Sequence, residues 1–424
     1  MKRRKLLYVL LSIVMTVTIS CFDDEDIDKF VNSVGGGSKG FTSFEEFNAA
    51  LAEAEDGDTF ELLYSFTGEG TQSLQGNFEL VRAAIFNAQK NIVLDLKGAK
   101  DITEIPENAF YRNGENLIYL TEVVLPQGVT AIGKNAFLNC TGLERINIPE
   151  EVKSIGMDAF NSCSSLEKIS MPGVTSLANR PFGSCSGLVS VDAPKLISMG
   201  EYAFAGCSSL EKIVLSDLET ISQYALYGTT SLKTIELPAS VRTIGRSAFN
   251  QSGLESFVIP DKVTILQQSL FLDCSNLTEV VMHKEITEIE TGVFRGTGLK
   301  SIVLPDKIKS LPSSIFNDCT SLEEFVIPAG VTSIGPWAFR NCSSLTSIEI
   351  PASVASLSSG VFNNCSALTT VTFLRETPAT LDSTNVFEGN ASGRLIIVPE
   401  GTGETYRGAT NWSAYAASIK AVNE

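Results

Sequence analysis

The sequence predicts a solenoid, a stack of about 12–13 coils of 22–23 residues that share one core and form a parallel β-sheet. A large apolar residue recurs at nearly fixed spacing, a short alternating segment precedes it in each repeat, and proline follows most of these segments. A repeat of this length cannot bury its own apolar face, so neighbouring coils must cover one another. The recurring residues are Phe110, Phe137, Phe160, Phe182, Phe204, Leu226, Phe249, Phe271, Phe294, Phe316, Phe339, Phe362 and Phe387.

Residues 1–20 have the charge and length pattern of an export signal. Four basic residues precede an apolar run from Leu6 to Ile19, and this run ends shortly before Cys21. The segment from Thr18 to Cys21 resembles a relaxed lipobox, in which the cysteine becomes the lipid-bearing first residue. We therefore expect residues 1–20 to be a lipoprotein signal peptide and Cys21 to be the lipid attachment site. Ordinary cleavage beside an unmodified cysteine is the alternative.

Residues 21–40 are expected to form an acidic anchor followed by a glycine-rich linker. Four acidic residues come soon after Cys21, and such a cluster resembles the export address of Gram-negative surface lipoproteins. The stretch Val31–Gly40 is typical of a flexible spacer. No later apolar run approaches the roughly 20 residues needed to span a bilayer. We expect an exported protein of the outer membrane or cell surface that meets the membrane only through a lipid on Cys21.

Both ends of the stack require caps, because a bare terminal coil exposes core and sheet edge. We expect an N-terminal α/β cap over residues 41–91. In this cap Ser43–Ala54 has apolar residues at helical spacing, with Ser43 as the candidate N-cap, and Asn77–Gln89 is a second candidate helix.

Residues 375–424 are expected to hold the last coil and a C-terminal cap. A strand is predicted at Leu395–Val398, where Pro399 ends it. The aromatic residues that follow are expected to fill the core of the cap; they are Tyr406, Trp412 and Tyr415.

Residues 92–374 form the repeats of the solenoid. In the repeat that begins at Leu143, the alternation around Ile146 and Ile148 predicts a short half-buried strand, and Pro149 ends it. Gly156 stands in a column that suggests a bend. Proline occupies the same column in other coils and fixes φ at a negative value, so this bend does not require left-handed backbone.

Eight of the nine cysteines stand three residues after the recurring apolar residue. Stacking would bring neighbouring cysteines within disulfide range, but serine or threonine fills the same column in other coils. We expect free, buried thiols that pack the turn. His283, the only histidine, stands in a column that proline usually fills, and we expect it to have a structural role.

The repeat pattern L-x-x-I-x-[IVL]-P-x-x-V-x-x-I-G-x-x-A-F-x-x-C resembles the BspA-like leucine-rich repeat family of bacterial surface lipoproteins. Leu143–Cys163, Leu322–Cys342 and Leu345–Cys365 match it almost in full, and the resemblance extends from about Ile92 to Phe387. It implies a right-handed leucine-rich repeat solenoid outside the cell, with adhesive or partner-binding roles. It implies no catalytic residues.

One candidate partner-binding surface lies on the first strand of each coil. The residue between the two buried positions must point outward, because side chains alternate along a strand. Four consecutive coils place valine there and predict an apolar stripe bordered by Glu279, Glu323 and Glu324; the alternative is that valine simply suits a strand. The four residues are Val258, Val281, Val303 and Val326.

A second candidate surface lies two residues before the recurring apolar residue. This column mostly holds small or polar residues, so we expect it to be exposed. Exposed aromatic residues are typical of recognition surfaces, although incidental surface aromatics are the alternative. The large side chains of the column are Arg180, Tyr202, Tyr224 and Trp337.

The formal net charge of −17 excludes nucleic acid as a natural partner, because such a chain repels phosphate. We expect no enzyme, no cofactor and no metal site, since the sequence has no nucleophile motif or ligand cluster. The favoured function is capture of an extracellular or host protein through the solenoid face. The alternatives are a glycan-binding accessory protein of a nutrient-uptake system and a polysaccharide-active enzyme that uses Asp192 and Glu236.

Overall fold

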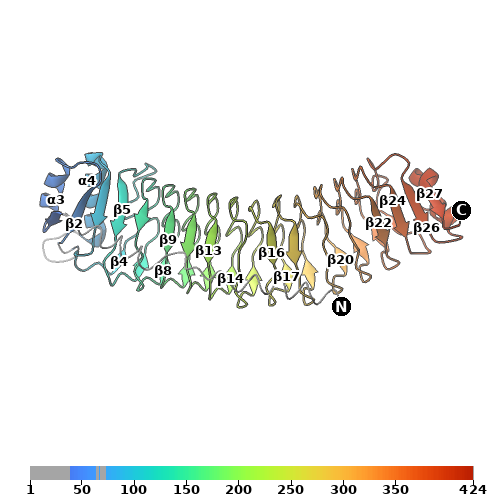
Figure 1. Ribbon diagram of the computed structural model, residues 1–424, viewed down its shortest axis with the longest axis horizontal. Coiled ribbons are helices and arrows are strands. Elements are labelled where there is room, and N and C mark those ends of the chain that lie inside the picture. Colours follow the sequence, from blue (N-terminus) through green and yellow to red (C-terminus); the bar gives the residue numbers. More distant parts are fainter. Residues whose placement is uncertain (1–38, 64–65, 67–72, 424) are drawn as a thin grey trace.

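Most coils contribute two short parallel strands, which stack into two rows along a gently curved body (Figure 1). The computed structural model describes residues 39–63, 66 and 73–423. The expected signal peptide, Cys21 and most of the expected linker lie outside the described residues. Residues 22 apart pair directly, as Ser190 does with Lys168 and Lys212, so successive repeats lie in register. The predicted solenoid is confirmed.

The first row of strands begins in a five-stranded sheet of order β1-β2-β3-β5-β7. It comprises β1 (Lys39–Phe41), β2 (Asp58–Leu62), β3 (Ile92–Asp95), β5 (Leu120–Val124), β7 (Arg145–Ile146), β9 (Lys168–Ser170), β11 (Ser190–Asp192), β13 (Lys212–Val214), β16 (Ser256–Val258), β18 (Glu279–Val281), β22 (Ser347–Ile350), β24 (Thr370–Phe373), β26 (Leu395–Val398) and β27 (Ile419–Ala421).

The second row consists of two-residue strands. Each follows the turn after the first segment of its coil, where most coils carry proline. It comprises β4 (Glu104–Ile105), β6 (Ala131–Ile132), β8 (Ser154–Ile155), β10 (Ser176–Leu177), β12 (Ser198–Met199), β14 (Thr220–Ile221), β15 (Thr243–Ile244), β17 (Ile265–Leu266), β19 (Glu288–Ile289), β20 (Ser310–Leu311), β21 (Ser333–Ile334), β23 (Ser356–Leu357) and β25 (Thr380–Leu381).

The predicted ladder of large apolar residues is the core of the stack. All thirteen members are buried. The rings of Phe160 and Phe182 lie 5.2 Å apart and nearly parallel, and Phe182 repeats this arrangement with Phe204 at 5.3 Å. Such ring pairs contribute about 0.5–1.5 kcal/mol beyond the burial of their area.

The two sheet rows are not continuous, in contrast to the single sheet that the repeat predicts. Two breaks in the second row fall between β15 and β17 and between β19 and β20. In both cases the intervening turn is one residue shorter: four residues lie between Phe249 and Leu254, whereas five lie between Phe160 and Leu166. At the second break Pro312 also lacks the N–H that a ladder bond would need.

Each full coil holds a left-handed position two residues before the apolar ladder. The φ angles there run from 53° to 64° between Asn108 and Gly360, and a second left-handed column directly precedes the cysteine column. The bend at Gly156, by contrast, is not left-handed, which confirms the expectation. A Cβ on Gly156 would lie 2.7 Å from the backbone nitrogen of Lys134, so glycine is needed there for close approach of the preceding coil.

Both ends of the stack carry helices, which were predicted for the N-terminal cap and not for the C-terminal one. α3 (Phe44–Leu51) begins after Ser43, whose Oγ accepts a hydrogen bond from the Glu46 amide at 3.2 Å. α4 (Leu74–Ala88) begins three residues earlier than expected, because Ser73 provides its N-cap. None of the helices in the described part of the chain is long and apolar enough to cross a membrane.

The C-terminal end adds α5 (Gly403–Gly408), the 3-10 helix η1 (Ser413–Ser418) and β27, and they pack over the last coil (Figure 1). The expected aromatic core is confirmed. Trp412 is fully buried and donates from Nε1 to the Ala379 carbonyl at 2.8 Å, while Tyr406 donates to the Arg375 carbonyl at 2.6 Å.

The eight cysteines of the repeats are free and buried, as expected. Each thiol donates to the carbonyl of the ladder residue one coil earlier; Cys274 reaches Phe249 at 2.9 Å and Cys163 reaches Phe137 at 3.2 Å. Burial raises the pKa of Cys274 and Cys319 to about 11. These thiols therefore stay neutral and link neighbouring coils.

The free energy of unfolding should fall in alkali because of these thiols. In the unfolded chain they ionise near a pKa of about 8.5, whereas the folded protein keeps them protonated. Their stabilising effect is complete below that pH and decreases as pH rises toward 11, by roughly 2 kcal/mol per thiol at pH 10. Urea unfolding at pH 7 and pH 10 measures the loss. Cys274→Thr, which places the residue of Thr297 in this column, should lose measurably less; an equal loss would contradict the account.

Gly156→Ala should lower the free energy of unfolding by about 1–3 kcal/mol, because its Cβ would overlap the backbone of the preceding coil. Gly408→Ala is the matched control, since a Cβ there meets no atom within 4 Å. Chemical denaturation of both variants measures the difference. Equal stability of the two variants would mean that the coils are not as closely stacked as described.

Candidate partner-binding surfaces

The valine row forms an exposed apolar stripe. Val258 pairs with Val281 across β16 and β18, which places their side chains in adjacent coils on one face. The exposed fractions are 65% for Val258, 46% for Val281, 87% for Val303 and 81% for Val326. Earlier coils of the same row carry half-buried polar residues such as Ser170 and Asp192. Val214 of the same row is half-buried and is followed by Glu236, so the run of consecutive exposed valines begins at Val258.

The two most exposed valines do not belong to a strand. The segments around Val303 and Val326 lie between β18 and β22, where no strand of the first row is assigned. The Leu299 coil also follows the second shortened turn. Strand propensity therefore explains valine at positions 258 and 281 better than at positions 303 and 326.

Charged side chains border the valine row. Glu279, Glu323 and Glu324 are all exposed. Lys300 lies 3.8 Å from Glu323, and both side chains are more than 60% exposed, so their attraction is largely screened by water. The rim of the stripe is therefore predominantly acidic.

The column of Arg180, Tyr202, Tyr224 and Trp337 does not have the uniform exposure that we expected. Asp158 and Ser247 of this column are buried, the two tyrosines are half-buried, and only some members, such as Arg180 and Trp337, are exposed. The small residues of the column reflect its left-handed backbone. Asparagine, aspartate, serine and glycine tolerate this conformation best, so their recurrence was the sequence signal for it.

Tyr202 and Tyr224 stack on each other, with ring centroids 4.8 Å apart and planes 6° from parallel. Arg246 belongs to the next coil, and its Nη2 donates to the Tyr224 hydroxyl at 2.8 Å. This hydrogen bond lowers the pKa of Tyr224. The facing surfaces of the two rings are therefore occupied within the protein. Sequence analysis missed Arg246, because its relation to Tyr224 depends on the stacking.

Arg180 is engaged by its own neighbour in the column. Its guanidinium contacts both carboxylate oxygens of the buried Asp158, at 3.0 Å and 3.1 Å. This paired geometry holds the arginine against the solenoid and adds to the hydrogen bond that Asp158 accepts from Asn161 Nδ2 at 2.7 Å. The Arg180 side chain is therefore held in an ion pair with Asp158.

Trp337 is 46% exposed, and among the described residues no second ring stacks on its indole. A Cβ on Gly360, the next residue of the column, would lie 2.8 Å from Trp337 Cδ1 and 3.1 Å from Nε1. The indole therefore lies against the Gly360 backbone, which is buried beneath it. The structure separates Trp337 from the Arg180, Tyr202 and Tyr224 cluster by several coils.

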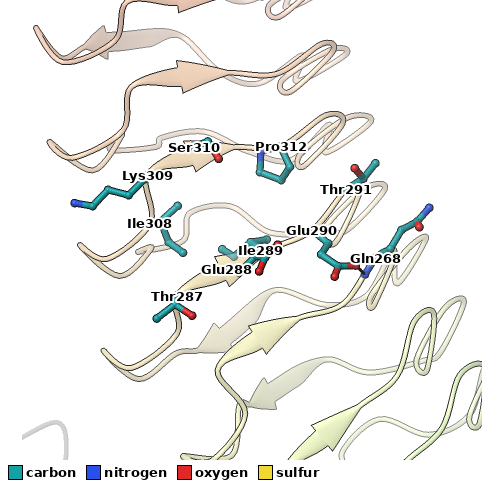
Figure 2. A pocket seen from close by; sticks show the side chains of 10 residues that line it. All are labelled: Gln268, Thr287, Glu288, Ile289, Glu290, Thr291, Ile308, Lys309, Ser310 and Pro312. Atoms are coloured by element: carbon teal, nitrogen blue, oxygen red, sulfur yellow. Dashed lines mark hydrogen bonds between the residues drawn. The ribbon is translucent and has the colours of Figure 1, made fainter.

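A polar groove marks the second break in the sheet, between β19 and β20. Figure 2 shows Glu290 turned toward Gln268 and Lys309 pointing away at the opposite end. The backbone N–H of Gln268 donates to the Glu290 carboxylate at 2.8 Å. The groove encloses about 660 Å3 and is open to solvent. Its only apolar lining residues are Ile289, Ile308 and Pro312, so it offers little surface for an apolar ligand.

The carboxylates of the enzyme alternative do not form a pair. Asp192 pairs with Val214 in the neighbouring coil, so a further coil separates it from Glu236. Asp192 accepts a hydrogen bond from Ser170 at 3.2 Å. In the described ranges no group of three or more histidine, cysteine or acidic side chains is placed to hold a metal ion.

His283 has the expected structural role. Its Nε2 lies 3.1 Å from the Pro260 carbonyl and 3.0 Å from the Val263 carbonyl, while Nδ1 accepts from the Glu285 amide. These contacts assign the proton to Nε2, which faces two acceptors. The imidazole therefore occupies the turn where most coils carry proline, and it links this turn to the preceding coil.

Comparison with known proteins agrees with this architecture. The model of the BspA type leucine rich repeat region matches in six copies, over residues 103–217, 197–323 and 309–409. A solved leucine-rich repeat protein from Bacteroides ovatus is 27% identical with a TM-score of 0.67, and the alignment covers 78% of this chain and 84% of that one.

A solved leucine rich cell surface protein from Faecalibacterium prausnitzii is 30% identical with a TM-score of 0.45; the alignment covers 64% of this chain and 83% of that one. A search of the curated proteins found no match. Leucine-rich repeat solenoids are typically surface or protein-interaction scaffolds, and these matches indicate no catalytic family. The extent of the repeat match and the solenoid geometry together establish that the chain belongs to the BspA-type leucine-rich repeat family.

Proposed function

We propose that this chain is a non-enzymatic cell-surface protein that captures an extracellular protein, such as a host protein, through the valine row. The observation that supports this proposal is the exposure of four consecutive outward valines, which reaches 87% at Val303. Isolated exposed apolar residues are ordinary, but a contiguous row of them is typical of a protein-binding surface. The function follows from this surface and from the scaffold character of the family.

The position of the two most exposed valines argues against a purely structural explanation. A β-branched residue in a strand needs no further reason, but Val303 and Val326 lie outside the assigned strands. Their side chains contribute little to the core, because more than 80% of each is exposed. Removing this surface from water on binding would favour association by about 25 cal/mol per Å2 of apolar area.

The acidic rim indicates the chemistry of the partner. Glu279, Glu323 and Glu324 border the stripe, and the whole chain has a formal net charge of −17. Opposite charge around a binding site accelerates encounter and rejects partners of the same sign. The partner is therefore expected to present an apolar or aromatic centre surrounded by lysine and arginine side chains.

Attachment to the cell surface is part of the same proposal. Residues 1–20 would act as a lipoprotein signal peptide, and a lipid on Cys21 would hold the protein at the outer membrane or cell surface. Residues 21–40 would then serve as the acidic anchor and linker, ahead of the cap over residues 41–91, the solenoid over residues 92–374 and the last coil and cap over residues 375–424. A flexible linker would let the solenoid face turn toward partners outside the cell.

The double variant Val281→Lys with Val303→Lys should abolish capture of the protein partner without unfolding the solenoid. Both side chains are exposed, so lysine replaces apolar contact area with charge and leaves the core intact. The measurement is binding to a panel of immobilised, purified host extracellular-matrix and serum proteins, with urea unfolding as the test of folding.

The matched control is Ser170→Lys with Thr372→Lys, which adds the same charge to the same row outside the valine stripe. We expect the control to bind as the unmodified protein does. Undiminished capture by the valine variant, or an equal loss in both variants, would contradict the proposed surface.

A further inference from the structure

The fold does not require a tryptophan at position 337. The other members of its left-handed column are mostly small or short polar residues, and the same backbone geometry forms with Ser314 one coil earlier and Gly360 one coil later. A left-handed residue with a Cβ costs roughly 1–2 kcal/mol, and a bulky side chain is among the least suited to it. A residue retained in strained backbone on the surface is a reason to look for a binding role.

The surroundings of Trp337 combine a flat apolar ring with side-chain amides. Asn363 lies near Gly360, with its Cβ 3.6 Å from the position of an added Gly360 Cβ, and its Nδ2 donates to Glu388 at 3.3 Å. Asn385 accepts from the Gly360 amide at 2.8 Å and from Ser359 Oγ at 3.1 Å. Amides also continue along the next left-handed column, where Asn364 donates to Asn341 at 3.2 Å.

This combination fits a sugar better than a protein side chain. The negative face of an aromatic ring attracts the C–H bonds on the flat side of a pyranose, and amides donate to and accept from its hydroxyl groups. A protein-binding hot spot would instead be surrounded by further apolar contacts that exclude water. The negative charge of the chain disfavours anionic sugars.

We propose that Trp337, supported by Gly360 and the neighbouring asparagines, is a binding platform for a neutral polysaccharide. The platform is an open surface and not an enclosed pocket, so it suits one residue within a long chain better than a free monosaccharide. It lies after the second strand of its coil, β21, whereas the valine row lies before that strand, in the first segment of each coil. The chain would thereby bind glycan at a site separate from the proposed protein-binding surface.

The test uses the purified protein with soluble neutral polysaccharides: laminarin, xylan, galactomannan, amylopectin and dextran, with polygalacturonate as the anionic comparison. The chain has two tryptophans, and Trp412 is fully buried in the C-terminal cap. A change in the exposed tryptophan fluorescence therefore reports on Trp337 directly. We expect at least one neutral polysaccharide to shift this signal and to retard the protein in affinity electrophoresis.

Trp337→Asn, which places the residue of Asn135 in this column, should weaken that retardation by at least about tenfold, equivalent to a loss of about 1.4 kcal/mol. Trp337→Tyr retains a ring and should keep part of the binding. Tyr224→Asn is the matched control, because it changes an aromatic residue of the same column whose stacked face is covered by Tyr202. Urea unfolding confirms that each variant is folded.

Absence of a fluorescence shift with every neutral polysaccharide would overturn the proposal. So would equal retardation of Trp337→Asn and the unmodified protein, or equal weakening by Tyr224→Asn. Loss of a protein partner in Trp337→Asn without loss of polysaccharide would identify the indole as a protein contact instead. The Val281→Lys and Val303→Lys variant should keep its polysaccharide binding, so failure of one site can be distinguished from failure of the other.

Discussion

The structure depends on the burial of each coil by its two neighbours. A segment of 22–23 residues has no second layer of its own, so its apolar side chains are removed from water only when the next coil lies over them in register. Register is what turns the repeated phenylalanines into stacked rings, the cysteines into a column of thiol-to-carbonyl bonds, and glycine into a requirement wherever two backbones approach closely. The caps follow from the same constraint, because the first and last coils lack one neighbour.

Much of this architecture could be predicted from the sequence because each column reports on one environment. The spacing of the large apolar residues predicted the ladder, and Ser43 predicted the start of α3. The breaks in the sheet were not predicted, although the shorter turns before Leu254 and Leu299 were visible as spacing. A missing residue shifts a coil by an amount that depends on how its neighbours adjust, and spacing alone does not contain that information.

The candidate surfaces were located by the same alternation, but their character depends on neighbours that the sequence does not reveal. The outward direction of Val303 followed from strand periodicity, whereas its position outside the assigned strands did not. Tyr224 and Trp337 share one column, yet Tyr224 stacks on Tyr202 and accepts a hydrogen bond from Arg246, while Trp337 lies over Gly360. A solenoid can thus present an apolar stripe and a separate polar, ring-bearing platform on different sides of the same coils.

The most direct test of the account is the proximity of equivalent residues in successive coils. Ser154 pairs with Ser176, and Ser176 pairs with Ser198, so cysteines introduced at neighbouring positions should lie about 4.8 Å apart, and those two coils apart about 10 Å. Bridging by dibromobimane, which becomes fluorescent when it joins two close thiols, distinguishes these cases. The account predicts strong bridging in the Ser154→Cys, Ser176→Cys pair and little in the Ser154→Cys, Ser198→Cys pair. Equal bridging in both pairs, or none in the first, would contradict the in-register stack.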